Sequence, residues 1–529
     1  MSYALVRRLL AGAALAAVFS VALVAQRGAD GSATARRVDP LRFRYVGPPS
    51  AGRIAAVVGV PGDTTTYYAG AASGGVWKST DGAKTFTPVF DGQPVQAIGA
   101  LALSASNPSI VWAGTGEAWA IRDADVMGDG VYKSTDAGAS WTNMGLTDTG
   151  RIGRIVVHPT DPQTVYVCAL GRATGPQQER GVFKTVDGGK TWTRSLFADA
   201  NTGCSGLSMD AHDPNVLVAG MWQLEMHTWA EYSGGPGSAV YMSRDAGATW
   251  KKLENGLPKS PVGKIDVAIA PSNAKRIYAL IQTANQGSLW RSDDGGVAWK
   301  VVSWDRTLIG RAGYYIRLAV NPTDENEVMV ANSGFHRSTD GGLTFPLGGF
   351  GGCGDCHDIW VDPKNADHWV QTGDSGMGVT TDHAKTFTNV LLPIGQMYHV
   401  AVDQRVPYWI YSNRQDNGTM RGQNDSPAPT PNVPSYANTT GVGSAIAPAQ
   451  PGRGGRGGPQ AVPWQLPIGG CESGFTLPDP SNPDIVWASC YANEVTRYDD
   501  RLKRARSVSP WIHSLDSAPM DTKLSLIHI

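Results

Sequence analysis

Short apolar runs separated by polar turns recur along most of the chain. One unit shows the pattern clearly: residues 97–103, 110–114 and 131–134 are apolar runs, and Trp141 begins a fourth. A turn at 104–108 joins the first two runs, and a long loop at 115–129 joins the second to the third. Runs of this length, bounded by turn residues, predict β-strands. Four antiparallel strands in succession predict the blade of a β-propeller.

A short motif follows the third strand of each predicted blade. Its pattern is Ser or Thr, any residue, Asp, any residue, a small residue, any residue, a small residue or Thr, and an aromatic residue, as in Ser243–Trp250. Ser and Asp side chains bond nearby backbone amides in tight turns, and glycine allows positive φ there. The motif recurs about every 50 residues, which is typical of propellers and solenoids. Its seven aspartates are Asp81, Asp136, Asp187, Asp245, Asp294, Asp340 and Asp382.

These seven aspartates are predicted to be structural, because a repeat fold needs one such turn in every blade whereas a catalytic centre is usually single. The predicted fold is therefore an all-β propeller. We expect a seven-bladed ring over residues 40–392 and the start of a second, truncated propeller over 393–520, with a single larger ring as the alternative. A Pro/Gly-rich insertion at 421–463 has the composition of a disordered segment.

The N-terminus has the pattern of a secretory signal over residues 1–25, with Arg7 and Arg8 before an apolar run and Ala25 as a cleavage point. An uncleaved membrane anchor is the alternative, although the run is marginal for spanning a bilayer. We expect cleavage, no stable membrane insertion, and a secreted, periplasmic or cell-surface protein.

Six cysteines in an exported chain predict disulfides. Cys168 and Cys204 lie in strands of consecutive repeats, and Cys471 and Cys490 lie in consecutive predicted strands. Cys353-Gly-Asp-Cys356-His357 has the spacing of c-type haem attachment. However, His357 opens a predicted strand, so a local disulfide or two free thiols is the preferred interpretation. No second Cys/His pair supports zinc, no loop has calcium-binding spacing, and no cofactor is predicted.

The charge of the chain excludes one class of partner. There are 45 Lys and Arg residues against 46 Asp and Glu residues, a formal net charge of −1. This balance provides no basic field for nucleic acid.

Chain direction separates two ends of the predicted ring. The first and third connections of each blade, which are the Pro turns and the aspartate motifs, share one end and are short. The second and fourth connections share the other end and vary in length, and function usually lies on variable loops over a rigid scaffold. We call this the variable-loop end.

The variable-loop end contains the predicted functional residues. Carboxylates beside exposed aromatic rings suit sugars, because rings stack on pyranose faces and carboxylates bind hydroxyl groups. The alternative is that these are solvated loop charges and packed tryptophans. The catalytic candidates are Glu117, Asp123, Asp125 and Asp129. The ligand-binding candidates are Trp119, Arg122, Arg151, Arg154, Arg172, Trp222, Glu225, His227, Trp229, Tyr314 and Tyr315.

The aspartate motif resembles the Asp-box, or BNR repeat, of sialidases, sortilin-type receptors and xyloglucanase-type glycosidases. Longer strings, among them residues 114–119, 152–159 and 398–403, resemble exported bacterial BNR-repeat proteins with a sortilin N-terminal-like domain, some of them called glycosyl hydrolases. Proteins of this kind are about twice as long, which implies a missing C-terminal portion. No sialidase-type Arg-Ile-Pro occurs near the start.

The resemblance implies two functions. The first is a secreted propeller that binds a glycan or peptide on its variable-loop end. The second is a glycoside hydrolase with a site between two propellers, whose two carboxylates lie roughly 5–5.5 Å apart for retention or 6.5–9.5 Å for inversion. A purely structural role at the cell surface is a third possibility, and the oligomeric state is left open.

Overall fold

The computed structural model describes residues 52–118, 127–227, 229–346, 353–415, 418–425, 464–465, 467–490 and 494–509. The predicted signal segment, nearly all of the predicted insertion, and the candidates Trp119, Arg122, Asp123 and Asp125 lie outside these ranges. The 3-10 turn η1 (Arg306–Ile309) is the one helical element of the described residues. Within the same ranges, no helix is long and apolar enough to cross a membrane.

The first three antiparallel sheets each contain four strands in chain order. They are formed by β1 (Ile54–Gly59), β2 (Tyr67–Ala71), β3 (Val76–Ser79) and β4 (Thr87–Pro88); by β5 (Ile98–Leu103), β6 (Val111–Thr115), β7 (Val131–Ser134) and β8 (Thr142–Asn143); and by β9 (Ile152–Val157), β10 (Val165–Ala169), β11 (Gly181–Thr185) and β12 (Thr193–Leu196).

The next four sheets repeat this arrangement, with an added hairpin strand in the fourth sheet and three strands in the sixth. They are formed by β13 (Thr202–Met209), β14 (Leu217–His227), β15 (Ala230–Ser233), β16 (Ala239–Ser243) and β17 (Lys251–Lys252); by β18 (Ile265–Ile269), β19 (Ile277–Ile281), β20 (Leu289–Ser292) and β21 (Lys300–Ser303); by β22 (Arg317–Val320), β23 (Val328–Ala331) and β24 (Phe335–Ser338); and by β25 (Cys356–Val361), β26 (Trp369–Gly373), β27 (Gly376–Thr380) and β28 (Thr388–Val390).

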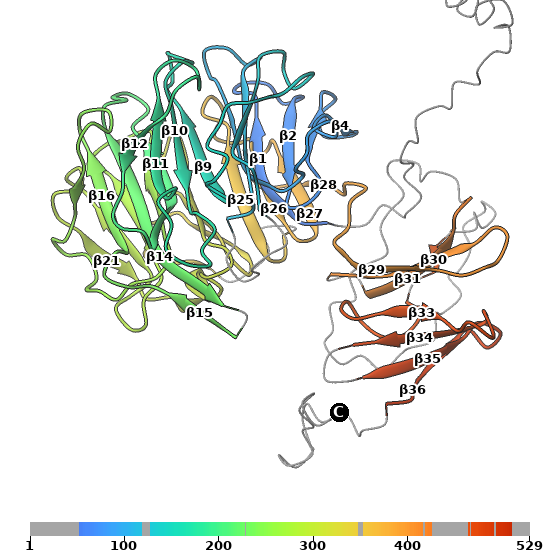
Figure 1. Ribbon diagram of the computed structural model, residues 1–529. Helices are drawn as coiled ribbons and strands as arrows, with labels where there is room; N and C mark the ends of the chain where they lie inside the picture. Colours follow the sequence, from blue (N-terminus) through green and yellow to red (C-terminus); the bar gives the residue numbers. More distant parts are fainter. Residues whose placement is uncertain are drawn as a thin grey trace, which may run out of the picture. The chain divides into compact units, whose positions relative to one another are not determined.

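These seven sheets close into a ring (Figure 1). Their first strands pack in the order β1, β5, β9, β13, β18, β22 and β25, and β25 packs back against β1. The first and seventh sheets share one apolar core, in which Ile54 and Tyr67 meet Val370 and Met377. The predicted all-β propeller is confirmed.

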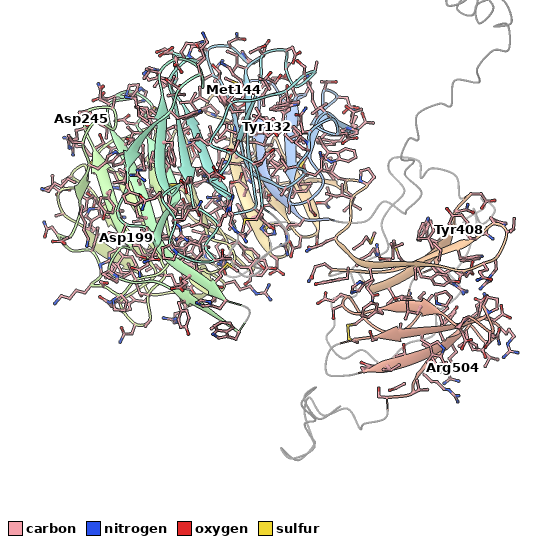
Figure 2. All side chains as sticks on the ribbon, viewed as in Figure 1. Tyr132, Met144, Asp199, Asp245, Tyr408 and Arg504 are labelled. Atoms are coloured by element: carbon pink, nitrogen blue, oxygen red, sulfur yellow. A yellow bond between two sulfur atoms is a disulfide. The ribbon has the colours of Figure 1, made fainter. Side chains whose placement is uncertain are left out.

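Aromatic residues fill the spaces between neighbouring sheets. Between the first and second sheets, Tyr132 packs edge-on against Phe90, with ring centroids 5.1 Å apart. Figure 2 labels Tyr132 among the side chains of the ring. The aromatic residue that closes each aspartate motif reaches towards the preceding sheet: Trp192 Nε1 donates to the Met144 carbonyl at 2.8 Å. The motif therefore contributes to the packing between sheets, as its aromatic position predicts.

The aspartate motifs form turns of one geometry. In the second sheet, Ser134 Oγ donates to Asp136 Oδ1 at 2.7 Å and accepts the Gly138 amide at 2.7 Å. Asp136 also accepts the amide and hydroxyl of Ser140. Gly138 has φ 89°, a conformation that glycine adopts without strain. These aspartates are fully used by their own turns.

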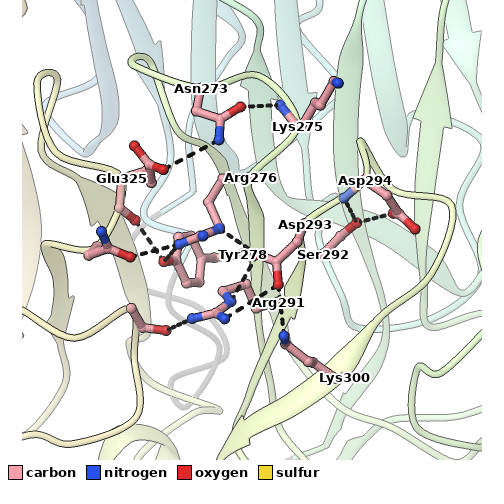
Figure 3. A network of polar contacts seen from close by, with 12 residues as sticks. Asn273, Lys275, Arg276, Tyr278, Arg291, Ser292, Asp293, Asp294, Lys300 and Glu325 are labelled. Carbon is pink, nitrogen blue, oxygen red and sulfur yellow. Dashed lines mark hydrogen bonds and ion pairs between the residues drawn. The ribbon is translucent and has the colours of Figure 1, made fainter.

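Cations tie most of these turns to the preceding sheet. Lys133 Nζ on β7 donates to the Gly188 carbonyl of the next turn at 3.0 Å, and Lys78 and Lys184 make the equivalent contacts one sheet before and after. Between the fifth and sixth sheets the contact becomes a network (Figure 3).

In that network the Asp293 carboxylate forms ion pairs with three cations, lying 2.5 Å from Arg276 Nε, 3.1 Å from Arg291 Nε and 2.8 Å from Lys300 Nζ. Arg276 Nη1 continues to Asn326 in the sixth sheet at 2.9 Å. The network lies at the end of the ring where the aspartate motifs lie, so it serves assembly of the sheets.

Two further four-stranded sheets follow the ring. They are formed by β29 (Met397–Val402), β30 (Trp409–Arg414), β31 (Gly418–Gln423) and β32 (Trp464–Gln465), and by β33 (Thr476–Pro478), β34 (Ile485–Ser489), β35 (Val495–Asp499) and β36 (Arg504–Ser507). The two sheets share a small core around Tyr411, Val486 and Tyr498. Val400 of β29 is 72% exposed, whereas β1 of the ring is buried throughout. The boundaries of a second propeller remain a prediction.

All six cysteines are paired, as Cys168–Cys204, Cys353–Cys356 and Cys471–Cys490. The first disulfide joins the third and fourth sheets of the ring. The local Cys353–Cys356 disulfide and the burial of His357 agree with the preferred interpretation of the Cys-Gly-Asp-Cys-His sequence.

Candidate functional site

The variable-loop end of the ring brings together side chains from three distant parts of the chain. Arg53 immediately precedes β1, Glu117 follows β6, and Asp374 follows β26. Because first strands begin and second strands end at the same end of an antiparallel blade, these three positions lie at one end of the ring. All three side chains are buried.

Arg53 is the centre of this group. Its Nε donates to Asp374 Oδ1 at 2.8 Å, its Nη1 to Glu117 Oε1 at 3.2 Å, and its Nη2 to the Tyr314 hydroxyl at 2.9 Å. One guanidinium group thus binds two carboxylates and a phenol. Burying an arginine is costly unless its charge is paired, and here every edge of the group has a partner.

The two carboxyl groups on Arg53 have different proton affinities. Burial raises the pKa of Glu117, and the charges of Arg53 and His357 offset only part of that effect. Burial also acts on Asp374, but the charges of His357 and Arg53 and their hydrogen bonds hold its pKa well below the usual range. His357 Nε2 lies 2.6 Å from Asp374 Oδ1, and the ring of Tyr315 packs edge-on against His357.

Lys264 connects this buried centre to the neighbouring loops. Its Nζ donates to the carbonyl groups of Tyr314 at 3.1 Å and Ala118 at 3.4 Å, and it lies 4.9 Å from the ring of Trp222. Burial and the charge of Arg317 lower the pKa of Lys264 to about 7. Lys264 therefore holds connections from the second, fourth and sixth sheets in register.

A hairpin of β14 and β15 projects from the ring at the variable-loop end (Figure 1). His227 stacks on Trp229 with ring centroids 4.7 Å apart and 11° between the planes, and its Nε2 lies 2.9 Å from Glu225 Oε1. Trp229 is 76% exposed, and Tyr232 is also exposed beside His227. We call Glu225, His227, Trp229 and Tyr232 the aromatic hairpin.

Glu231 occupies the opposite face of the same hairpin, because it pairs with the buried Met226 across the strands. It is half-buried. Burial raises its pKa to about 6, with Lys264 acting in the opposite direction. A Cβ on Gly313 would lie 2.6 Å from Glu231 Oε1, so glycine at 313 leaves the space that this carboxyl occupies.

The predicted site residues divide into three groups. Glu225, His227 and Trp229 come together on the exposed hairpin. Arg151, Trp222, Tyr314, Tyr315 and Glu117 are buried, so they support the site from within instead of presenting the surface expected of ligand contacts.

The third group lies elsewhere. Asp129 accepts from the Tyr132 hydroxyl at 2.8 Å within its own sheet, and Arg172 makes an exposed ion pair with Asp148. Arg154 lies inside the ring, on β9, where its Nη1 donates to Asp358 at 2.9 Å.

Sequence reasoning named Glu231 within the 221–238 connection but missed four residues of this end as site residues: Arg53, Lys264, His357 and Asp374. All four flank or begin first strands or follow a second strand, where a side chain faces the ring's centre. A polar residue at such a strand end could have been predicted to face the ring's centre. Asp374, however, belongs to no recognisable sequence motif. Within the described ranges, no cluster of His, Cys, Asp or Glu residues could hold a metal ion.

Comparison with known proteins identifies relatives among xyloglucanases, which are glycoside hydrolases. The chain is 24% identical over 207 residues to a xyloglucanase from Paenibacillus sp, covering 39% of this chain and 17% of the relative. It is 24% identical over 389 residues to a probable oligoxyloglucan-reducing end-specific xyloglucanase from Neosartorya fischeri, covering 64% of this chain and 45% of the relative. The chain thus spans less than half the length of these relatives. No family model matches the chain.

Solved structures with a similar course of the chain include a GH74 enzyme from Niastella koreensis, with a TM-score of 0.35 and 16% identity over 85% of this chain and 62% of that one. YCF48 from Cyanidioschyzon merolae has a TM-score of 0.44 and 15% identity over 65% of this chain and 99% of that one.

Proposed function

We propose that this chain is part of a glycoside hydrolase that acts on a β-glucan of the xyloglucan class. The observation that carries the proposal is the exposed aromatic hairpin, in which an indole, an imidazole and a carboxylate lie together at the variable-loop end. The similarity to xyloglucanases supports the same class of substrate. Binding without hydrolysis is the second candidate, because the hairpin alone suits retention of a glycan.

The aromatic hairpin has the chemistry of a sugar platform. The flat face of a β-linked glucose unit is apolar and matches the exposed face of an indole. Stacking on His227 holds Trp229 in one orientation, so less side-chain entropy is lost when a ligand binds. Glu225 accepts hydrogen bonds from sugar hydroxyl groups at the edge of the platform. A ligand along the hairpin would also pass Tyr232.

Hydrolysis needs one carboxyl group that is protonated and one that is ionised. Glu231 suits the general acid for a sugar unit beyond the platform, because it is half-buried, has a pKa of about 6, and lies on the face of the hairpin opposite the platform. We assign Glu117 and Asp374 to support of the centre, since both are buried and bound to Arg53. Asp123 and Asp125 remain predictions for the second carboxylate.

The test uses the full chain incubated with xyloglucan and with other β-glucans, followed by an assay for new reducing ends and for retained glycan. Trp229→Ala removes the platform and should lower retention by up to about tenfold, as expected for loss of a stacking contact of about 0.5–1.5 kcal/mol. Glu231→Gln should abolish release while leaving retention intact. Trp487→Ala, which removes a partly exposed indole on β34, is the matched control.

If the unaltered chain retains xyloglucan but produces no new reducing ends, the proposed function becomes glycan binding without hydrolysis. If the unaltered chain neither retains nor cleaves any β-glucan, the glycan proposal is wrong, and the peptide ligand of the sequence analysis becomes the next candidate.

A further inference from the structure

The ring contains a pocket at the end opposite the aromatic hairpin. Its volume is about 340 Å³, and it lies between the first strands of the third to sixth sheets and the turns that follow two of them. Its lining combines polar and apolar groups in similar proportion, and its apolar residues include Val157, Leu207, Met209 and Leu318. This volume is within the range of small-molecule sites. The glycan proposal makes no use of it.

Arg154 provides the main polar group of the pocket. Its side chain is 24% exposed. Among the described residues it donates one hydrogen bond, from Nη1 to Asp358 at 2.9 Å. A guanidinium group has five N–H donors, so most of them remain for a ligand or for water.

Ser208 adds a second donor to the wall. Its Oγ accepts the Ile269 amide at 3.1 Å, which leaves the hydroxyl proton to point elsewhere. The pocket therefore offers N–H and O–H donors beside apolar groups, and a matching ligand carries an oxygen acceptor on an apolar body.

The charges around the pocket decide whether that acceptor is an anion. Arg154 and Arg317 are the nearby cations, and Asp358 and Asp266 are the nearby anions: Asp358 lies 2.9 Å from Arg154 and 3.7 Å from Arg317, and Asp266 accepts the Leu318 amide at 2.8 Å. The two pairs balance. Asp210 adds a carboxylate to the lining, which disfavours an anionic ligand further.

We propose that this pocket binds a small uncharged amphiphile, an aliphatic or aromatic body bearing a carbonyl oxygen that accepts hydrogen bonds from Arg154. The apolar part of the lining contacts the body of the ligand, and the guanidinium group binds the oxygen. Because the pocket and the aromatic hairpin lie at opposite ends of the ring, this binding is independent of the proposed glycan site.

Titration calorimetry with the full chain tests the proposal, using butyrophenone as the uncharged ketone. Butylbenzene has a similar shape without the oxygen, and 4-phenylbutyrate carries a negative charge. Butyrophenone should bind at a single site, and both comparison compounds should bind at least about tenfold more weakly, the effect of one hydrogen bond to a charged group.

Two variants locate the site. Arg154→Met should weaken butyrophenone about tenfold or more and leave the affinity for butylbenzene nearly unchanged, a difference that a general loss of structure would not produce. Ala211→Trp places a large ring at an exposed position of the pocket lining and should weaken both compounds. Arg504→Met, at an exposed arginine of β36 outside the pocket, is the matched control.

The proposal is overturned if butyrophenone shows no saturable binding, if 4-phenylbutyrate binds most tightly, or if Ala211→Trp binds butyrophenone as the unaltered chain does. Should Arg154→Met fail to fold by circular dichroism, the Ala211→Trp result decides. Saturating xyloglucan should leave the affinity for butyrophenone unchanged. The pocket proposal can therefore fail or succeed independently of the glycan proposal.

Discussion

At the scale of single residues, the ring's centre is organised by buried charges that satisfy one another. Arg53 binds Glu117 and Asp374, and Asp374 also binds His357. Removing one member of such a group leaves a buried charge without its partner, which costs more than the pair itself contributes. The group therefore fixes the geometry of the variable-loop end, while the exposed hairpin beside it remains available to a ligand.

The Glu231 carboxyl predicts that the free energy of unfolding depends on pH. Its pKa is raised in the folded protein to about 6 from 4.5, so its stabilising contribution is present below pH 4.5 and is lost as pH rises through 6. Relative to Glu231→Gln, the unaltered chain should lose at most about 2 kcal/mol of unfolding free energy across that interval, less after solvent screening.

Urea unfolding of both chains across this pH interval measures the difference. Glu254→Gln, at a carboxyl that is 78% exposed, should show no such change. A constant difference between the unaltered chain and Glu231→Gln at all pH values would contradict the raised pKa.

At the scale of elements, the aspartate motif has two functions within the fold. It closes the turn after the third strand, and its backbone carbonyl groups receive cations from the preceding sheet, as Gly188 receives Lys133. Repetition of this contact links neighbouring sheets in the same way around much of the ring, and each sheet depends on its neighbours for stability.

Acid should weaken these turns. Hydrogen bonds from Ser140 and Ser134 lower the pKa of Asp136 to about 2, so the contribution of its carboxylate is present above the ordinary pKa near 3.8 and is lost as pH falls through about 2. Asp136→Asn should therefore be less stable than the unaltered chain at pH 5, and the difference should shrink towards pH 2.

Thermal unfolding at both pH values measures this effect. Asp148→Asn, at an exposed carboxyl outside the turns, provides the comparison. Equal stability of Asp136→Asn and the unaltered chain at pH 5 would show that the turn does not depend on the carboxylate.

At the scale of the whole molecule, closure of the ring buries one face of the first sheet and one face of the seventh sheet against each other. The first sheet packs against the seventh through the core around Ile54 and Val370. Ile394, after the last strand of the seventh sheet, packs against this core and lies close to Gly52. The ring thus needs the chain as far as Ile394.

A chain from Val46 to Gly395 should therefore fold by itself and unfold cooperatively on heating. A shorter chain that ends at Phe345 lacks the seventh sheet and leaves the faces of β1 and β22 without partners, so it should lose cooperative unfolding. Calorimetry of the two chains compares them. An unfolded Val46–Gly395 chain would mean that the last two sheets are required by the ring.

The sequence by itself determined the local features of this protein. Strand lengths, turns and the repeated aspartate motif depend on neighbouring residues, so they can be predicted in order along the chain. The positions of Cys168 and Cys204 in consecutive repeats suggested that they meet, and the structure decided that they pair. The hairpin residues Glu225, His227 and Trp229 were predicted together for the same reason, since they occupy one connection.

Only the tertiary structure decided which charges meet at the centre of the ring. Arg53 and Asp374 are 321 residues apart in the chain, and they meet because the seventh sheet closes against the first. Nothing in the local pattern distinguishes a carboxylate that will be buried there, such as Glu117, from one in a solvated loop. The pocket around Arg154 has the same origin, because its walls come from four sheets whose convergence is a property of the closed ring.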